Sequence, residues 1–290
     1  MAQWVQGARP RTLPTAIAPV LVGTGAAIGD GVIAPVEAVL ALLVSVGMVV
    51  GVNFANDYSD GIRGTDDERV GPVRLVGSKL AAPSAVRAAA FVTLGVGALA
   101  GLALLSLSGQ WWLLAVGAVC IAGAWFYTGG RRPYGYVGLG EVAVFVFFGP
   151  VAVLGTVITQ AGPPGAPAVV SAIAVGMLTC AVLVANNLRD IPTDRATGKN
   201  TLAVRLGEVD TRRLYAALVV APILLAAAAG LRGWPMLLGL LALPLAIRPA
   251  RAVLRGAEGR ALVAVLGQTG MLLLVWSVLT AVGLAWSGWV

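Results

Sequence analysis

The chain has 290 residues, of which 58% are hydrophobic and only 11% are charged, whereas a soluble domain averages about 25% charged residues. A water-soluble core cannot bury this much apolar surface, so the composition excludes a soluble globular protein and indicates that lipid is the solvent. The net charge of +7 would suggest nucleic acid in a soluble protein, but here it lies in short loops between apolar spans and indicates membrane topology instead.

A membrane-spanning helix needs about 20 mostly apolar residues. By that measure the sequence predicts an all-α integral membrane protein with nine transmembrane helices, which we place at 12–29, 35–56, 84–107, 110–128, 138–160, 167–189, 212–231, 234–250 and 262–286. We expect one domain over 1–290, with cytoplasmic loops at about 57–83 and 190–211.

The distribution of basic residues supports this count. If the N-terminus is cytoplasmic, all but one of the 20 Lys and Arg residues fall on the cytoplasmic side, and Arg232 is the exception. Cytoplasmic loops of membrane proteins carry such an excess, so we expect the C-terminus outside. The Arg-rich, Lys-poor basic set with abundant Ala, Val and Gly suggests a GC-rich bacterium, so we expect the protein in a bacterial cytoplasmic membrane.

Two predicted helices end in acidic and amide residues at the cytoplasmic side. The segments are VGVNFANDYSDG (50–61) and LVANNLRDIPTD (183–194). Residues spaced by four and then three or four share one helix face, so each segment presents one polar stripe. The stripes consist of Asn53, Asp57 and Asp60, and of Asn186, Asp190 and Asp194. Their similarity is either a coincidence or the trace of a duplicated helical unit.

The sign of this charge is unusual, because the C-terminal end of a helix carries a negative partial charge and favours cations. A bound divalent cation would remove that conflict. The chain has no histidine, and Cys120 and Cys180 both lie inside apolar runs, so only oxygen ligands are offered. Such ligands indicate Mg²⁺ together with substrate phosphates. The alternative is that polar residues simply end the spans.

The adjoining loops alternate glycine with charged residues. The first reads GIRGTDDERVGPVRLVGSKL and the second RATGKNTLAVRLG. Arg and Lys in such loops can bind a diphosphate, although the positive-inside bias alone would also explain their sign. The candidate residues for this binding are Arg63, Arg74, Lys79, Arg189, Lys199 and Arg205.

The combination of NDYSDGIRGTDDERVGPVR and NNLRDIPTDRATGKNTLAVRLG resembles the UbiA-type intramembrane prenyltransferases, along nearly the whole chain from ARPRTLPTAIAPVLVG (8–23) to the ninth helix. Within that family, Gly64 at a position often held by aspartate is typical of the branch that prenylates 1,4-dihydroxy-2-naphthoate in menaquinone synthesis. Asp66 or Asp67 would then replace the missing acid.

The resemblance implies nine helices around a central cavity with a lateral opening to lipid. It also implies two Mg²⁺ ions, one held by Asp57, Asp60 and Asp66 or Asp67 and the other by Asp190 and Asp194. Asn53, Asn56, Asn186 and Asn187 would support these ligands, and Lys199 would bind phosphate. The implied partners are polyprenyl diphosphate, 1,4-dihydroxy-2-naphthoate and the bilayer, with no nucleic acid.

Breaking an allylic diphosphate ester leaves a carbocation, which needs a dry cavity with electron-rich faces. Among the aromatic residues of 124–136 and 144–149, we expect Tyr127 to line that cavity. The alternative for each of these residues is ordinary placement at the lipid or the membrane interface. Arg131, Arg132 or Arg9 could bind the carboxylate of the acceptor. Glu141, an acid within a span, could accept a phenolic proton or bond a backbone amide.

Two rival functions remain at this stage. A transporter would also carry intramembrane acids, although transporter sites lie near the middle of the membrane rather than at its inner border. Another UbiA-type enzyme could use a different acceptor, such as 4-hydroxybenzoate, homogentisate, haem or a chlorophyll-type alcohol. The sequence leaves the prenyl chain length and the oligomeric state open.

Overall fold

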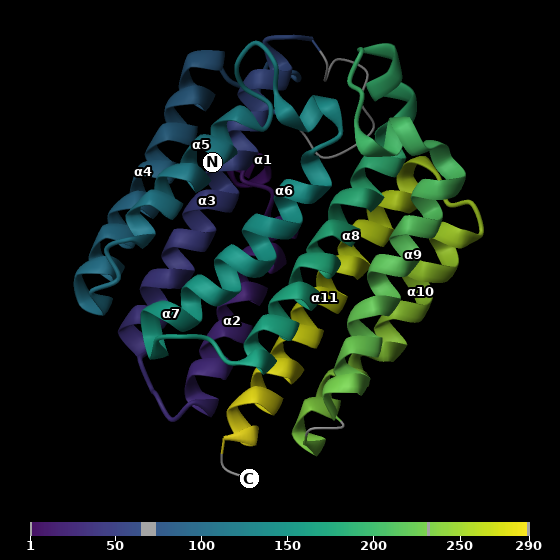
Figure 1. The fold of residues 1–290 in the computed structure, drawn as a ribbon. Helices are drawn as coiled ribbons and strands as arrows, with labels where there is room; N and C mark the ends of the chain where they lie inside the picture. The colour runs from purple at the N-terminus through teal and green to yellow at the C-terminus, as the bar shows by residue number, and fades with distance from the viewer. Residues whose placement is uncertain (1, 65–73, 231–232, 289–290) are drawn as a thin grey trace.

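The computed structural model describes residues 2–64, 74–230 and 233–288, and in these ranges every regular element is a helix. The helices bundle into one body that is longer than it is wide (Figure 1). Their bounds are α1 Ala2–Gly7, η1 Pro10–Thr12, α2 Leu13–Gly29, α3 Pro35–Gly61, α4 Pro83–Ser108, α5 Leu113–Phe126, η2 Tyr134–Val137, α6 Gly140–Val146, η3 Phe147–Leu154, α7 Gly155–Ala161, α8 Ala166–Ala196, α9 Leu202–Gly230, η4 Trp234–Ala242, α10 Leu243–Leu254 and α11 Gly259–Ser287.

Eight helices of the described residues are long and apolar enough to cross a membrane. Three of them are built from several elements, namely α1 to α2, α6 to α7 and η4 to α10. The fourth predicted span, 110–128, is the exception because its helix α5 has only 14 residues. The structure therefore confirms an all-helical membrane protein, with one predicted span shorter than expected.

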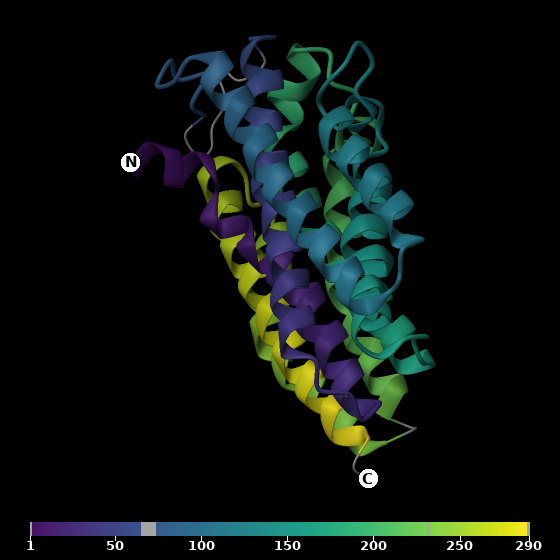
Figure 2. The ribbon, with the colours of Figure 1, turned by 90° about the vertical axis from the view of Figure 1, so that its left-hand side faces the viewer.

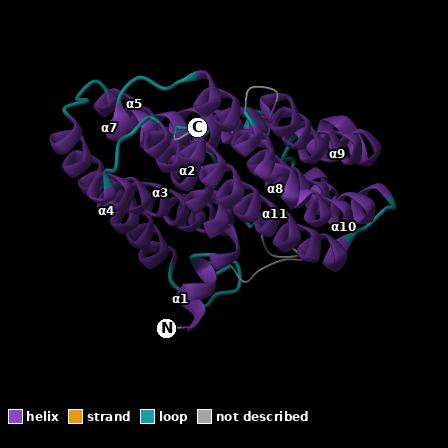
Figure 3. Cartoon of the chain, turned by 90° about the horizontal axis from the view of Figure 1, so that it is seen from below, coloured by secondary structure: helices purple, strands orange, loops and turns teal. Residues whose placement is uncertain are grey.

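The bundle is organised around α8. Viewed along its length, α2, α3, α8 and α11 lie inside, while α4, α5, α9 and α10 lie at the periphery (Figure 3). Of the most apolar window of α8, 72% is buried, which is the largest share among the spans. The main hydrophobic core lies where α8 meets α2, α9 and α11, and it contains Leu178, Tyr215, Leu272 and Trp276.

Glycines allow the inner helices to approach closely. A Cβ atom at Gly25 in α2 would lie 2.5 Å from the carbonyl oxygen of Ala281 in α11. At the contact between α3 and α4, a Cβ atom at Gly47 would lie 2.9 Å from the Cα atom of Gly97. Small residues at such crossings are the usual means of packing membrane helices, since lipid supplies no hydrophobic force between them.

The span from α6 to α7 contains a π-helix. Pro150 lies inside this η3 segment, where it has no N–H to donate and its ring displaces the preceding turn. π-Helical turns occur mostly as local widenings of α-helices and are frequent at functional sites. The sequence predicted one continuous helix over 138–160 and did not predict the π-helical turn within it.

The two acidic motifs, residues 50–61 and 183–194, are helical throughout. Helix α3 continues to Gly61 and α8 continues to Ala196, each beyond the predicted end of its span. Asn53, Asp57 and Asp60 therefore all lie on α3, and the second motif lies entirely on α8. These ends reach the same end of the bundle, drawn uppermost in Figures 1 and 2, and the last residues of α11 lie at the opposite end.

Candidate active site

A cavity of about 600 Å³ runs through the bundle between α2, α3, α4, α5, η3 and α8. Most of its wall is apolar. Its polar side chains include the following: Arg9, Thr12, Asn53, Asn56, Asp60, Arg74, Tyr127, Thr128, Tyr136, Asn186, Asn187, Asp190, Thr193, Asp194 and Lys199. One cavity thus joins a polar end, where both acidic motifs lie, to a long apolar extension.

Asp60 is the carboxylate of the first motif that lines this cavity, beside the amides Asn53 and Asn56. Its Oδ1 atom accepts a hydrogen bond from the Tyr136 hydroxyl and lies 3.2 Å from the Lys199 ammonium nitrogen. The Arg74 guanidinium lies 3.7 Å from the other carboxylate oxygen, Oδ2. Since the Asp60 side chain is only 5% exposed, these cations neutralise a buried charge.

Asp57 points elsewhere. It is fully buried and does not line the cavity. Its two carboxylate oxygens accept the backbone N–H groups of Leu75 and Val76, with N–O distances of 2.7 and 3.0 Å. Asp57 therefore anchors the segment that follows residue 73 to the end of α3, whereas its predicted role as a metal ligand stays a prediction.

The second motif forms a compact network on α8. Arg189 binds both carboxylate oxygens of Asp190, with N–O distances of 2.7 and 2.8 Å, and also donates to Asn186 Oδ1 at 2.9 Å. Asp190 and Asp194 both line the cavity, but Arg189 does not. The chain reverses after α8 so that the Lys199 N–H donates to the Asp194 carbonyl oxygen at 2.8 Å.

Lys199 lies between the two motifs. Its ammonium nitrogen is 4.7 Å from the ring centroid of Tyr136, within the range of a cation–π interaction. The Asn200 N–H in turn donates to the Tyr136 carbonyl oxygen at 2.9 Å. Tyr136 thus holds the loop after α8 against the end of α3. The sequence did not predict this role, and the pair of tyrosines in RRPYGY was the only signal for it.

The other three predicted amides, Asn53, Asn56 and Asn187, are also held by hydrogen bonds. Asn53 donates to the Ala8 carbonyl oxygen at 3.0 Å and to Thr12 Oγ1 at 2.9 Å, which ties the bend before α2 to α3. Asn56 accepts from the Thr128 hydroxyl at 2.8 Å. Asn187 is bonded to Glu141 and is considered below.

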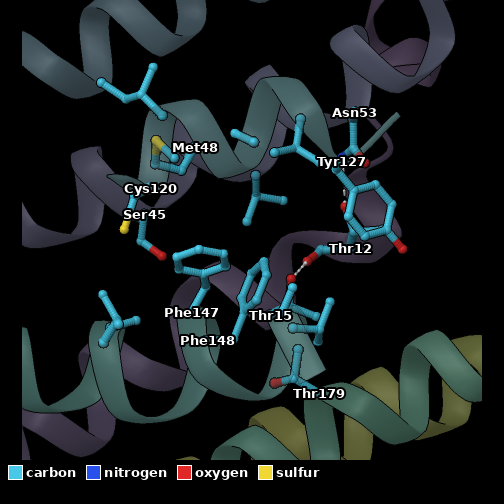
Figure 4. Close-up of a pocket in the computed structure, with 18 of the residues that line it drawn as sticks. Thr12, Thr15, Ser45, Met48, Asn53, Cys120, Tyr127, Phe147, Phe148 and Thr179 are labelled. Atoms are coloured by element: carbon cyan, nitrogen blue, oxygen red, sulfur yellow. Dashed lines mark hydrogen bonds between the residues drawn. The ribbon is translucent and has the colours of Figure 1, made fainter. Parts of the chain in front are cut away.

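Tyr127 lies at the cavity wall, and Figure 4 shows its ring among the labelled lining residues. It packs edge-on against Tyr134, with ring centroids 5.5 Å apart. Burial raises the pKa of the Tyr134 hydroxyl to about 12, so this group stays protonated and donates to the Gly123 carbonyl oxygen at 2.7 Å. Phe147 and Phe148 of η3 also project into the cavity (Figure 4).

Several predicted basic residues do not reach the cavity. Those at the surface are Arg63, Lys79, Arg131, Arg132 and Arg205. Arg63 donates to the carbonyl oxygens of Thr128 and Gly130, and Arg205 donates to the Asn200 carbonyl oxygen at 3.3 Å. Of the three arginines considered for the acceptor carboxylate, Arg9 is the one that lines the cavity. Asp66 and Asp67 lie outside the described residues.

Comparison with known proteins agrees with this geometry. The UbiA prenyltransferase family model matches residues 16–274. The chain is 59% identical to the 1,4-dihydroxy-2-naphthoate octaprenyltransferase of Mycobacterium tuberculosis, over 98% of this chain and 97% of the relative. It is 38% identical to the Escherichia coli protein of the same name, over 99% and 96% of the two chains.

Among solved structures, the fold is similar to a UbiA homologue from Archaeoglobus fulgidus bound to GPP and Mg²⁺. The TM-score is 0.68 at 14% identity, and the match covers 97% of this chain and all of the homologue. The apo structure of a UbiA homologue from Aeropyrum pernix gives a TM-score of 0.69 at 15% identity, over 89% and 94% of the two chains. The chain therefore belongs to the UbiA prenyltransferase family.

Proposed function

We propose that this protein is a prenyltransferase that moves a polyprenyl group from polyprenyl diphosphate to 1,4-dihydroxy-2-naphthoate, releasing diphosphate and CO₂ and giving demethylmenaquinone. One observation carries the proposal. Acidic side chains from α3 and α8 open on the polar end of one cavity that continues as an apolar channel. The full-length similarity to enzymes named for this acceptor supports the choice of substrate.

The residues at the polar end fit Mg²⁺. No three acidic or thiol side chains of the described residues gather closely enough to hold an ion alone, but Mg²⁺ is usually held by one or two carboxylates together with substrate phosphates. Asp60 would hold one ion and Asp190 with Asp194 a second, assisted by the amide oxygens of Asn56 and Asn186 and completed by substrate phosphates. When bound, Mg²⁺ neutralises charge that develops on the departing diphosphate.

The chain's own cations take part in binding the diphosphate. Lys199 and Arg74 both line the cavity within 4 Å of Asp60, so they lie where a phosphate held near that carboxylate would be. Arg is suited to bidentate contact with phosphate and Lys acts as a point charge. Their charges stabilise the leaving group as the allylic C–O bond breaks.

The apolar part of the cavity protects the carbocation and holds the prenyl chain. Phe147, Phe148 and Tyr127 bring ring faces to this part of the wall, where electron-rich faces stabilise a cation and exclude water. The acceptor ring carbon that bears the carboxylate attacks the cation, and loss of CO₂ restores aromaticity. This step needs no strong base, which agrees with a chain that has no histidine.

The proposal extends to the membrane topology. The polar end of the cavity lies at the bundle end that carries the basic loops, which the positive-inside rule assigns to the cytoplasm. We place nine helices in a bacterial cytoplasmic membrane, counting the short α5 with the eight longer spans, with the N-terminus inside and the C-terminus outside. The acceptor then enters from the cytoplasmic side, with Arg9 placed to bind its carboxylate.

The test uses the purified protein with polyprenyl diphosphate, Mg²⁺ and 1,4-dihydroxy-2-naphthoate, with the product identified by mass spectrometry. We expect a prenylated naphthol that has lost the mass of CO₂, formed by the wild type and lost in Asp190→Ala. A transporter would instead give isotope flux into vesicles without a covalent product. Prenylation of 4-hydroxybenzoate in preference to the naphthoate would assign the protein to another branch of the family.

A further inference from the structure

Glu141 lies next to the cavity without touching it. It is in the first turn of α6 and is only 7% exposed, and it is absent from the cavity wall. A carboxyl group in this position cannot contact a substrate that occupies the cavity. A general base must come within hydrogen-bond reach of the proton that it removes, so the geometry does not favour that role for Glu141.

Within the described residues, its carboxyl group is hydrogen-bonded to a side chain that does line the cavity. Glu141 Oε1 accepts a hydrogen bond from Asn187 Nδ2 at 2.8 Å. Asn187 lines the cavity from α8, where it lies in the sequence between Asn186 and Asp190 of the second motif. The backbone is held as well, because the Cys180 thiol donates to the Glu141 carbonyl oxygen at 3.0 Å.

This contact decides which way the Asn187 amide points. A carboxyl oxygen that accepts a hydrogen bond requires the NH₂ group of asparagine as its donor, so the carbonyl oxygen must face the other way. None of the described residues donates to that oxygen. Asn187 therefore offers the cavity a hydrogen-bond acceptor rather than a donor.

Burying Glu141 is costly, and its hydrogen bond from Asn187 offsets only part of that cost. Its second oxygen, Oε2, is buried and has no hydrogen-bond partner there. An unsatisfied buried polar atom typically costs about 1–3 kcal/mol. An acid kept inside a membrane span at that cost is a functional suspect, and orienting Asn187 is the one action that its contacts support.

We propose that Glu141 is a positioning residue, which turns the carbonyl oxygen of Asn187 into the cavity so that it accepts a hydrogen bond from a phenolic hydroxyl of the aromatic acceptor. This inference rests on the proposed function. A hydroxyl that donates a hydrogen bond releases more electron density into its ring, which makes the attacking ring carbon more nucleophilic. Asn187 contacts the acceptor in this scheme, and Glu141 acts only through Asn187.

The test measures KM and kcat for each substrate separately in the purified full-length protein. We expect Glu141→Ala and Asn187→Ala each to lower kcat/KM for the naphthoate about tenfold, while KM for polyprenyl diphosphate stays within about twofold. The double variant should be no worse than Asn187→Ala alone, because Glu141 has no effect without its partner. Cys180→Ala, which touches Glu141 only through the backbone, is the matched control and should not change KM for the naphthoate.

Glu141→Gln separates positioning from acid–base catalysis. The glutamine carbonyl oxygen can still accept from Asn187 Nδ2, so we expect this variant to remain within about threefold of the wild type. Loss of a general base would instead lower kcat by about 100-fold or more. Should Glu141→Ala fail to fold, the comparison of Glu141→Gln with Asn187→Ala decides the question.

Three results would overturn the inference: a Glu141→Gln variant as slow as Glu141→Ala, additive losses in the double variant, or a loss confined to KM for polyprenyl diphosphate. A wild type that forms no prenylated naphthol would overturn the proposed function and this inference with it. An active wild type with any of the three results overturns the inference alone.

Discussion

Asp57 and Asp60 lie three residues apart on α3 but face different surroundings. Asp60 lines the cavity beside Lys199 and Arg74, whereas Asp57 binds the backbone of Leu75 and Val76. Both acids lie on α3, and helical spacing predicts that they share one face, but the neighbours of each come from loops whose paths no periodicity reveals. The simpler expectation is that every acid of the motif has the same role. The geometry instead places Asp60 at the cavity and Asp57 on the backbone of the following segment.

Substitution of the two acids should therefore have different consequences. We expect Asp60→Asn to lower turnover about 100-fold, because it removes charge from the cavity, without changing the order of the loop. Asp57→Asn keeps one acceptor oxygen and loses the other, so the segment around residues 74–80 should loosen. Limited trypsin digestion after the exposed Lys79 would detect this. If trypsin cleaved Asp60→Asn faster than the wild type but Asp57→Asn at the wild-type rate, this division of roles between the two acids would be wrong.

Lys199 gives a prediction on substrate binding. Its ammonium group lies 3.2 Å from Asp60 and lines the cavity, so we expect Lys199→Met to raise KM for polyprenyl diphosphate about tenfold and leave KM for the naphthoate unchanged. Arg205→Met is the matched control, because Arg205 is exposed on the following helix and does not line the cavity. Equal effects of the two substitutions would show that only the overall charge of the loop matters.

At the scale of the elements, hydropathy located the spans well and their internal irregularities poorly. The boundaries of α2, α4 and α11 agree with the predicted spans to within three residues. The π-helix of η3 was missed, because it depends on local backbone chemistry around Pro150 that a sum of hydropathy does not contain.

The close contact between α2 and α11 yields a stability prediction. Gly25→Ala would place a Cβ atom 2.5 Å from a backbone oxygen of α11, so the helices would have to separate. We expect the free energy of unfolding to fall by about 1–3 kcal/mol, seen as a lower thermal midpoint in detergent. Gly95→Ala in α4 is the control, since nothing lies within 4 Å of its Cβ position, and alanine should stabilise that helix slightly. A larger loss at Gly95 than at Gly25 would contradict the packing.

For the whole molecule, composition and charge alone were enough to identify a membrane protein with its acidic motifs at one end. They could not show that α3 and α8 bring those motifs to one cavity, because helix packing is decided by shape at positions such as Gly25 and Gly47. The contacts of Tyr136 with Asp60 on α3 and with Lys199 after α8 likewise leave no pattern in the sequence.

The proposed topology can be tested with reporter fusions. A C-terminal alkaline phosphatase fusion should be active and a C-terminal green fluorescent protein fusion dark, because the C-terminus is expected outside the cytoplasm. A fusion truncated after Ala196 should show the reverse, since α8 is expected to end inside. Activity of the phosphatase at both positions would mean that the span count is wrong.

The brevity of α5 has a consequence for the lipid around it. Its 14 residues rise about 21 Å, while the hydrocarbon layer is about 30 Å thick, and Trp111 and Trp112 at its start are exposed, as expected of interfacial anchors. With α5 as a span, as we propose, the bilayer would thin beside it, and such hydrophobic mismatch carries an energy that depends on acyl length. Reconstituted enzyme should accordingly work faster in vesicles of short-chain lipids than in long-chain ones, so that membrane thickness itself would regulate quinone synthesis.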